Sequence, residues 1–201
     1  MEDRRGITRE DLLKRGALAG GALAAGGALI GGLPSPAASA PSADRDERTL
    51  KYLLELEDLQ AAFYAEALKR ANLSGEMRQF AEVVGGHERE HVDYLRKALG
   101  AKAAKPATFD FADATSSAER FLATAVDIEE TGLGAYNGAA ANLTAATLRD
   151  AARIVSVEAR HTAWARDLAG RNPAPDASDK PASESEVRET IARTAFVKSG
   201  G

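Results

Sequence analysis

The feature that most constrains the fold of this chain is a glutamate on the apolar face of each of four predicted helices. Apolar residues recur at helical spacing over residues 44–71, 74–99, 116–141 and 144–169. The glutamates in these segments are Glu57, Glu88, Glu129 and Glu158. Each buried, unpaired carboxylate would cost several kcal/mol, so one core that holds all four needs a compensating positive charge. No β-branched alternation lasts four residues, and we expect an all-α fold without strands.

The two halves of the chain repeat the same arrangement of polar residues. Each half has a glutamate, a tyrosine seven residues later, and an E-x-x-H element about thirty residues after the first glutamate. The members are Glu57, Tyr64, Glu88 and His91 in the first half, and Glu129, Tyr136, Glu158 and His161 in the second. The sequence therefore predicts two related helical hairpins with equivalent polar faces.

The charges and spacing of these residues indicate a metal centre. Two divalent cations would balance four carboxylates, and neutral imidazoles would complete the ligand shells. A spacing of three residues places the Glu and His side chains of each E-x-x-H element on one face of a helix. We predict a site for two divalent metal ions, iron first and manganese second. The predicted ligands are Glu57, Glu88, His91, Glu129, Glu158 and His161.

Several neighbouring residues leave alternatives open. Glu130 competes with Glu129, although the spacing to Tyr136 favours Glu129. His87 is expected at the rim of the site or in a hydrogen bond to a ligand, with direct ligation as the alternative. Tyr64 and Tyr136 are expected to pack in the core and to make a hydroxyl hydrogen bond. The glycine pair at residues 85–86 predicts either a close helix crossing or a local bulge.

The stretch HEREH, residues 87–91, also matches the H-E-x-x-H motif of zinc metalloproteases. In that interpretation His87 and His91 bind zinc and Glu88 is the general base. The mirrored segment VEARH, residues 157–161, has Val157 in place of the first histidine. The duplicated element is therefore E-x-x-H, which makes the protease a remote alternative.

The connections predict a particular bundle topology. Short loops join the first helix to the second and the third to the fourth, so each pair should be antiparallel. Residues 100–116 form a long crossover that Phe109 and Phe111 should hold against the bundle. We expect a four-helix bundle over 41–172 and an extension over 173–201 with a short helix from Ser183. Capping boxes are expected at Ser116–Glu119 and Ser183–Glu186.

The first forty residues are predicted to be an export signal. A basic stretch precedes the apolar run from Ala17 to Leu33, and Ala38–Ala40 has the small residues of a cleavage site. The stretch TREDLLKRG resembles a twin-arginine signal, except that Glu10 stands where the second arginine belongs. We therefore expect a periplasmic, cell-wall or extracellular protein without a stable membrane span after processing.

Composition excludes other classes of function. The chain has no cysteine, so disulfides, thiolate nucleophiles and iron–sulfur clusters are excluded. The formal net charge is −4, and lysines and arginines are scattered. No nucleic-acid partner is expected.

Four stretches of the chain resemble the ferritin-like superfamily, and more narrowly the exported ferritin-like domain family that contains plant desiccation-related proteins. They are LELEDLQAAFYAEAL (54–68), GGHEREHVDYLRKAL (85–99), DIEETGLGAYNGAA (127–140) and SVEARHTAW (156–164). The resemblance implies a ferritin-like bundle. It also implies that Glu57 and Glu129 are terminal ligands, Glu88 and Glu158 bridging ligands, and His91 and His161 terminal nitrogen ligands.

The expected function is oxidation of Fe(II) or reaction with O₂ or H₂O₂ at the two metals. The alternative is a metal-binding or stress- and desiccation-protective protein without turnover. A homo-oligomer is compatible with either function.

Overall fold

The computed structural model describes residues 40–199. The predicted export signal, with its cleavage site, therefore lies outside the described residues except for Ala40. Among the described residues, no helix combines the length and apolar character needed to cross a bilayer.

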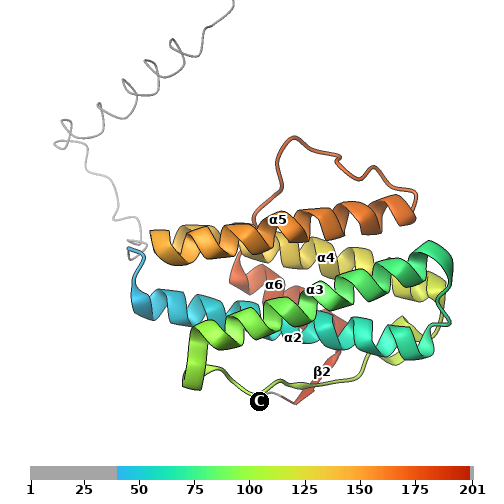
Figure 1. The fold of residues 1–201 in the computed structure, drawn as a ribbon, viewed down its shortest axis with the longest axis horizontal. Coiled ribbons are helices and arrows are strands. Elements are labelled where there is room, and N and C mark those ends of the chain that lie inside the picture. Colours follow the sequence, from blue (N-terminus) through green and yellow to red (C-terminus); the bar gives the residue numbers. More distant parts are fainter. Residues whose placement is uncertain (1–39, 200–201) are drawn as a thin grey trace, which may run out of the picture. The chain divides into compact units, whose positions relative to one another are not determined.

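Four long helices make up most of the described part of the chain, and the all-α prediction is confirmed (Figure 1). They are α2 (Ala43–Arg70), α3 (Gly75–Leu99), α4 (Ala118–Ala139) and α5 (Ala145–Leu168). A shorter helix, α6 (Glu184–Thr194), follows an extended loop. Short 3₁₀ helices occur at Gly100–Lys102, Ala112–Thr115 and Ala140–Asn142. The predicted boundaries of the long helices hold to within two residues.

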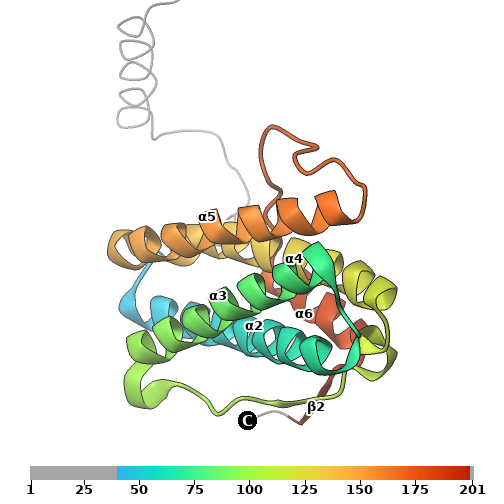
Figure 2. The same ribbon diagram turned by 45° about the vertical axis from the view of Figure 1, so that its right-hand side comes forward.

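The long helices pair as two hairpins, α2 with α3 and α4 with α5. The hairpins then pack against each other, with α2 against α4 and α3 against α5. The crossover from α3 to α4 runs along the outside of the first hairpin (Figure 2). This is the predicted connectivity, and it brings one face of every long helix to a common interior.

The expectation of no strands was wrong. Thr108–Phe109 (β1) in the crossover pairs antiparallel with Val197–Ser199 (β2) after α6. Both strands are too short for an alternating pattern to be visible in the sequence. Nearby, Phe111 is buried and packs edge-on against Phe63 of α2, with a distance of 5.5 Å between ring centroids. The prediction that Phe109 and Phe111 hold the crossover against the bundle is confirmed, because Phe109 stacks on Phe111.

The helix caps follow the predicted chemistry with one shift in position. Ser183 and Glu186 form the predicted capping box at the start of α6. The predicted box at Ser116 was wrong, because α4 begins one residue later and Ser117 accepts the backbone N–H of Arg120. The Ser116 hydroxyl instead donates to the carbonyl oxygen of Asp113 in the preceding 3₁₀ helix.

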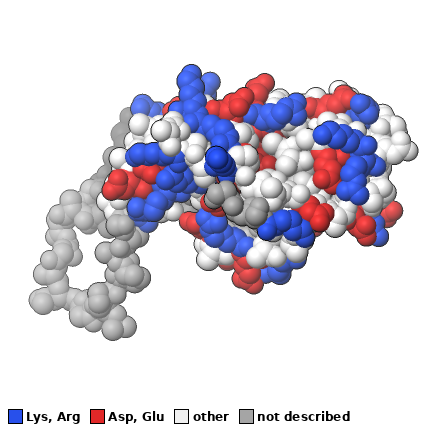
Figure 3. Space-filling view, turned by 90° about the horizontal axis from the view of Figure 1, so that it is seen from below, with Lys and Arg blue, Asp and Glu red and all other residues white. Residues whose placement is uncertain are grey.

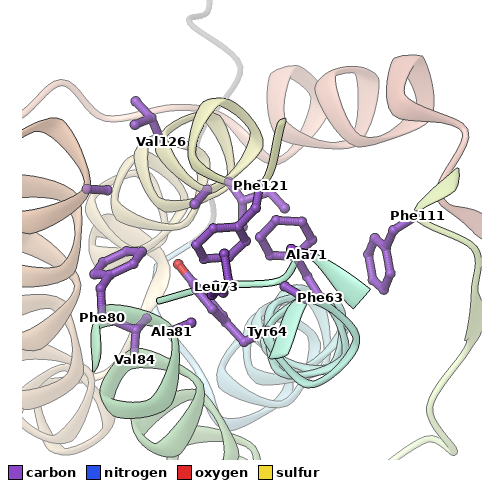
Figure 4. Close-up of a cluster of buried hydrophobic side chains, with 14 of the residues drawn as sticks. Phe63, Tyr64, Ala71, Leu73, Phe80, Ala81, Val84, Phe111, Phe121 and Val126 are labelled. Carbon is purple, nitrogen blue, oxygen red and sulfur yellow. The ribbon is translucent and has the colours of Figure 1, made fainter. Parts of the chain in front are cut away.

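Two apolar clusters fill the bundle, one on each side of a central polar layer. In the first cluster, the aromatic rings of Phe63, Tyr64, Phe80 and Phe121 meet from three helices (Figure 4). The second cluster is mainly aliphatic and includes Leu53 of α2, Leu95 of α3 and Ile154 of α5. The four glutamates of the repeated pattern lie between these clusters along their helices.

The surface carries charges of both signs. In the face shown in Figure 3, lysines and arginines alternate with aspartates and glutamates over the described part of the chain. That face has no broad basic area, in agreement with the scattered cations of the sequence. The absence of a nucleic-acid partner stays a prediction.

Gly85 lies at a close approach of α2 and α3. A Cβ atom at this position would lie 2.7 Å from the Cβ of Tyr64, which is shorter than any normal carbon–carbon contact. A Cβ at Gly86 would meet only the Nη2 atom of Arg89, at 3.9 Å. The glycine pair therefore serves a close helix crossing, and only its first member is required for the crossing.

The two glycines should respond oppositely to alanine. Gly85→Ala should lower the free energy of unfolding by about 1–3 kcal/mol, because the added methyl group forces α2 and α3 apart. Gly86→Ala is the matched control and should raise it by up to about 1 kcal/mol through helix propensity. Urea unfolding followed by circular dichroism measures both changes. Equal effects of the two substitutions would contradict the assignment.

Candidate metal centre

The structure brings the six predicted ligands together in the polar layer between the two apolar clusters. Every long helix contributes one glutamate, and the E-x-x-H helices α3 and α5 add one histidine each. The four glutamates have no exposed surface, and His91 and His161 are 7% and 3% exposed. Burial of this depth separates them from the surface glutamates, which water solvates.

His91 faces three of the carboxylates. Its Nδ1 atom lies 3.4 Å from Glu57 Oε2, 3.2 Å from Glu88 Oε2 and 3.2 Å from Glu158 Oε1. One ligand atom from each of these four residues lies within 4.8 Å of the others. This set of four could hold one metal ion.

His161 faces a second set in the same way. Its Nδ1 atom lies 2.9 Å from Glu88 Oε1, 3.6 Å from Glu129 Oε2 and 3.7 Å from Glu158 Oε1. These four residues also offer ligand atoms within 4.8 Å of one another. Glu88 and Glu158 belong to both sets, so two metal positions would share them as bridging carboxylates.

Most of the facing atoms lack a hydrogen-bond partner. They are Glu57 Oε2, Glu88 Oε1, Glu129 Oε2, Glu158 Oε1 and His161 Nδ1, and the other carboxylate oxygen of Glu158 is also unpaired. The short distance between His161 Nδ1 and Glu88 Oε1 is therefore a contact without hydrogen-bond geometry. Buried polar atoms are normally paired, and an unpaired one costs about 1–3 kcal/mol. A set of unpaired donor atoms that converge in a buried layer fits the ligand shell of metal cations.

Two tyrosines connect the hairpins through hydrogen bonds to Glu57 and Glu129. The Tyr64 hydroxyl on α2 donates to Glu129 Oε1 on α4 at 2.6 Å. The Tyr136 hydroxyl on α4 donates to Glu57 Oε1 on α2. The predicted hydroxyl hydrogen bonds are confirmed, and each one crosses to the opposite hairpin. Each bond engages Oε1 and leaves Oε2 of the same carboxylate facing the centre.

Two of the buried carboxyl groups, those of Glu57 and Glu158, hold protons more strongly than usual. Burial, and then the charge of Glu88, raise the pKa of Glu57 to about 8. Burial is also the main reason why the pKa of Glu158 is raised to about 7. Without a cation, the carboxyl groups of Glu57 and Glu158 therefore retain protons near neutral pH.

The neighbouring carboxylates raise the pKa values of both imidazoles. Burial alone would lower the pKa of His91, but its contacts with Glu158 and Glu57 outweigh burial and raise that pKa to about 12. The same balance, with Glu129 and Glu88 as partners, raises the pKa of His161 to about 10. In the metal-free protein, imidazolium groups supply the positive charge that the carboxylates require.

The structure decides between the open alternatives for two residues. Glu130 pairs with Arg166 at 2.9 Å and is not in either set, whereas Glu129 lies in the polar layer. The Nδ1 atom of His87 lies 2.9 Å from Nε2 of His161, and the two rings are stacked. The predicted hydrogen bond from His87 to a candidate ligand is confirmed.

The same contacts disfavour the zinc-protease alternative. A protease site would need His87 and His91 to converge on one metal, but His87 faces the imidazole of His161. Glu88 would need access to a water molecule and a substrate, yet it is fully buried among carboxylates. The geometry follows the duplicated E-x-x-H element.

One buried residue beside the centre was not singled out from the sequence. Gln60 is 2% exposed, and its Nε2 atom has no hydrogen-bond partner. A Cβ at Gly132 would lie 3.1 Å from the Gln60 amide and 3.2 Å from Glu158 Oε2, so Gly132 leaves room for this amide. Gln60 lies three residues after Glu57, the same spacing as in E-x-x-H, and this spacing is the signal that could have identified Gln60.

Comparison with known proteins agrees with this geometry. A sequence model of the ferritin-like domain family matches residues 45–171, a segment that contains all six candidate ligands. No curated protein matches the chain. The match concerns the ferritin-like domain alone, and the relation to desiccation-related proteins stays a prediction.

Metal binding should release protons from this cluster. Coordination requires carboxylates and neutral imidazoles, but the raised pKa values of Glu57, His91 and His161 keep protons on these three groups at pH 7. Affinity should therefore rise with pH, by about tenfold per pH unit for each proton released. Calorimetric titration with Mn(II) in buffers of different ionisation enthalpy measures the number released. Binding heats that do not depend on the buffer would contradict this expectation.

Proposed function

The chain belongs to the ferritin-like domain family, and on this premise we propose that it is an exported dimetal-carboxylate protein. In this proposal it oxidises Fe(II) or reacts with O₂ or H₂O₂. The observation that carries the proposal is the buried layer of four carboxylates and two imidazoles, most of whose facing atoms have no hydrogen-bond partner. Two divalent cations would match the formal charge of the four glutamates.

The proposed metals are iron first and manganese second. Carboxylate oxygens and imidazole nitrogens are suitable ligands for both metals, and the chain has no thiolate that would favour softer ions. Glu57 and His91 would hold one ion, Glu129 and His161 the other, and Glu88 and Glu158 would bridge them. When bound, the two ions supply changes of valence and exchangeable coordination positions for O₂ or H₂O₂.

The remaining residues of the centre orient its ligands and keep it dry. The hydroxyl groups of Tyr64 and Tyr136 fix the terminal glutamates, so that Oε2 of each carboxylate faces inward. The aromatic cluster on one side and the aliphatic cluster on the other exclude bulk water. Low local polarity strengthens the attraction between carboxylates and cations.

The proposed location outside the cytoplasm depends on residues 1–40, whose basic, apolar and small-residue stretches resemble an export signal. Periplasm, cell wall and extracellular space all fit this signal. Assembly into a homo-oligomer is compatible with the proposal and is best measured on the processed chain.

Removal of the two bridging glutamates tests the ligand assignment. The double variant Glu88→Ala and Glu158→Ala should lose both metal equivalents and keep its helix content, because each alanine removes a buried charge without breaking a helix. Glu130→Ala is the matched control, since Glu130 adjoins Glu129 but pairs with Arg166. Elemental analysis of protein from metal-supplemented cells measures the metal. Wild-type metal content in the double variant would refute the assignment.

Turnover is tested on the metal-loaded wild type. Anaerobic protein mixed with Fe(II) and then with O₂ or H₂O₂ should form Fe(III) faster than buffer alone, and the double variant should not. Two bound equivalents without any acceleration would leave a metal-binding protein that is not an enzyme. Wild type that is metal-free after loading would refute the metal centre.

A further inference from the structure

The two hairpins differ at one polar position beside the otherwise matched ligands. His87 precedes Glu88 on α3, and Val157 precedes Glu158 at the equivalent position of α5. The side chain of His87 is partly buried and can donate or accept a hydrogen bond, whereas that of Val157 has no donor or acceptor. The ligand set has approximate twofold symmetry, and this position breaks it.

His87 forms a hydrogen-bond contact with a candidate ligand of one metal position, namely His161. Its Nδ1 atom lies 2.9 Å from His161 Nε2, and the rings stack with their centroids 5.1 Å apart. The other nitrogen of His161, Nδ1, is the atom that faces Glu88, Glu129 and Glu158. The two nitrogens of His161 therefore point in different directions, one to the centre and one to His87.

This contact suits the tautomer of His161 that coordination through Nδ1 would require. A neutral imidazole that coordinates through Nδ1 carries its proton on Nε2. That N–H is then placed to donate to Nδ1 of His87, which accepts it if His87 is protonated on its own Nε2. The bond fixes the ring orientation and presents the Nδ1 lone pair to the centre.

The second hairpin does not offer His91 an equivalent hydrogen-bond partner. The mirrored partner would come from position 157, where valine cannot accept a hydrogen bond. Its Nδ1 atom faces carboxylates as that of His161 does, so the ligands themselves are matched. The difference between the two positions lies behind the histidines.

We propose that the two metal positions are inequivalent, and that the position formed by Glu88, Glu129, Glu158 and His161 binds its ion more tightly because His87 orients His161. The inference rests on the proposed dimetal function. His87 is a positioning residue in this arrangement and is not itself a ligand. Loss of such an orienting partner typically lowers metal affinity by about 10–100-fold.

Titration of the full-length metal-free chain with Co(II), followed by visible absorption and calorimetry, tests the inference. Wild type should bind two equivalents in two resolved steps. His87→Ala should weaken the first step by about 10–100-fold and merge it with the second, while the stoichiometry stays at two. His87→Asn should largely retain the first step, because Asn Oδ1 can stand in for Nδ1 as the acceptor.

Val157→Ala is the matched control at the mirrored position and should leave both steps unchanged. Thermal unfolding of each metal-free variant separates a local effect from a loss of fold, since a positioning role alters metal affinity at unchanged helix content.

Four results would overturn the inference. One equivalent bound by His87→Ala would make His87 a ligand. Equal weakening by His87→Ala and Val157→Ala would indicate a general packing effect. Two indistinguishable steps in wild type that His87→Ala leaves unaltered would refute the inequivalence alone, whereas a wild type that binds no Co(II) would refute the proposed metal centre as well.

Discussion

Mutual repulsion among four buried carboxylates is the constraint on which the rest of this structure depends. Each glutamate has no exposed surface, and the two imidazoles between them are the only nearby cations among the described side chains of the polar layer. Burial raises the pKa values of Glu57 and Glu158, so protons help to balance the charge of the metal-free cluster. Repulsion between the carboxylates would push the four helices apart. Packing of the two apolar clusters, the tyrosine hydrogen bonds and the pairing of the hairpins oppose this repulsion.

The local parts of this arrangement were predictable from the sequence. The four long helices follow from a period of 3.6 residues, and the six residues of the polar layer follow from charges placed on apolar faces. Both signals are contained within single helices. The repeat also favoured Glu129, which lies in the polar layer, over Glu130, which pairs with Arg166.

The parts that were missed depend on contacts between distant segments. The pairing of β1 with β2 joins residues about ninety positions apart and leaves no pattern in either short segment. The space that Gly132 leaves for the Gln60 amide depends on the packing of α4 against α2, which the sequence of neither helix shows by itself. The start of α4 was misplaced because Ser116 and Ser117 are adjacent and both have capping side chains.

The crossed hydrogen bonds of Tyr64 and Tyr136 have a consequence for how such a chain can originate. Each hairpin supplies the tyrosine that secures the other hairpin's glutamate, so neither completes its own half. Two copies of a single hairpin, related by a twofold axis, would present the same six ligands and the same exchange. The present chain has the organisation of a tethered homodimer. Encoding the halves separately is what permits a histidine at position 87 and a valine at position 157.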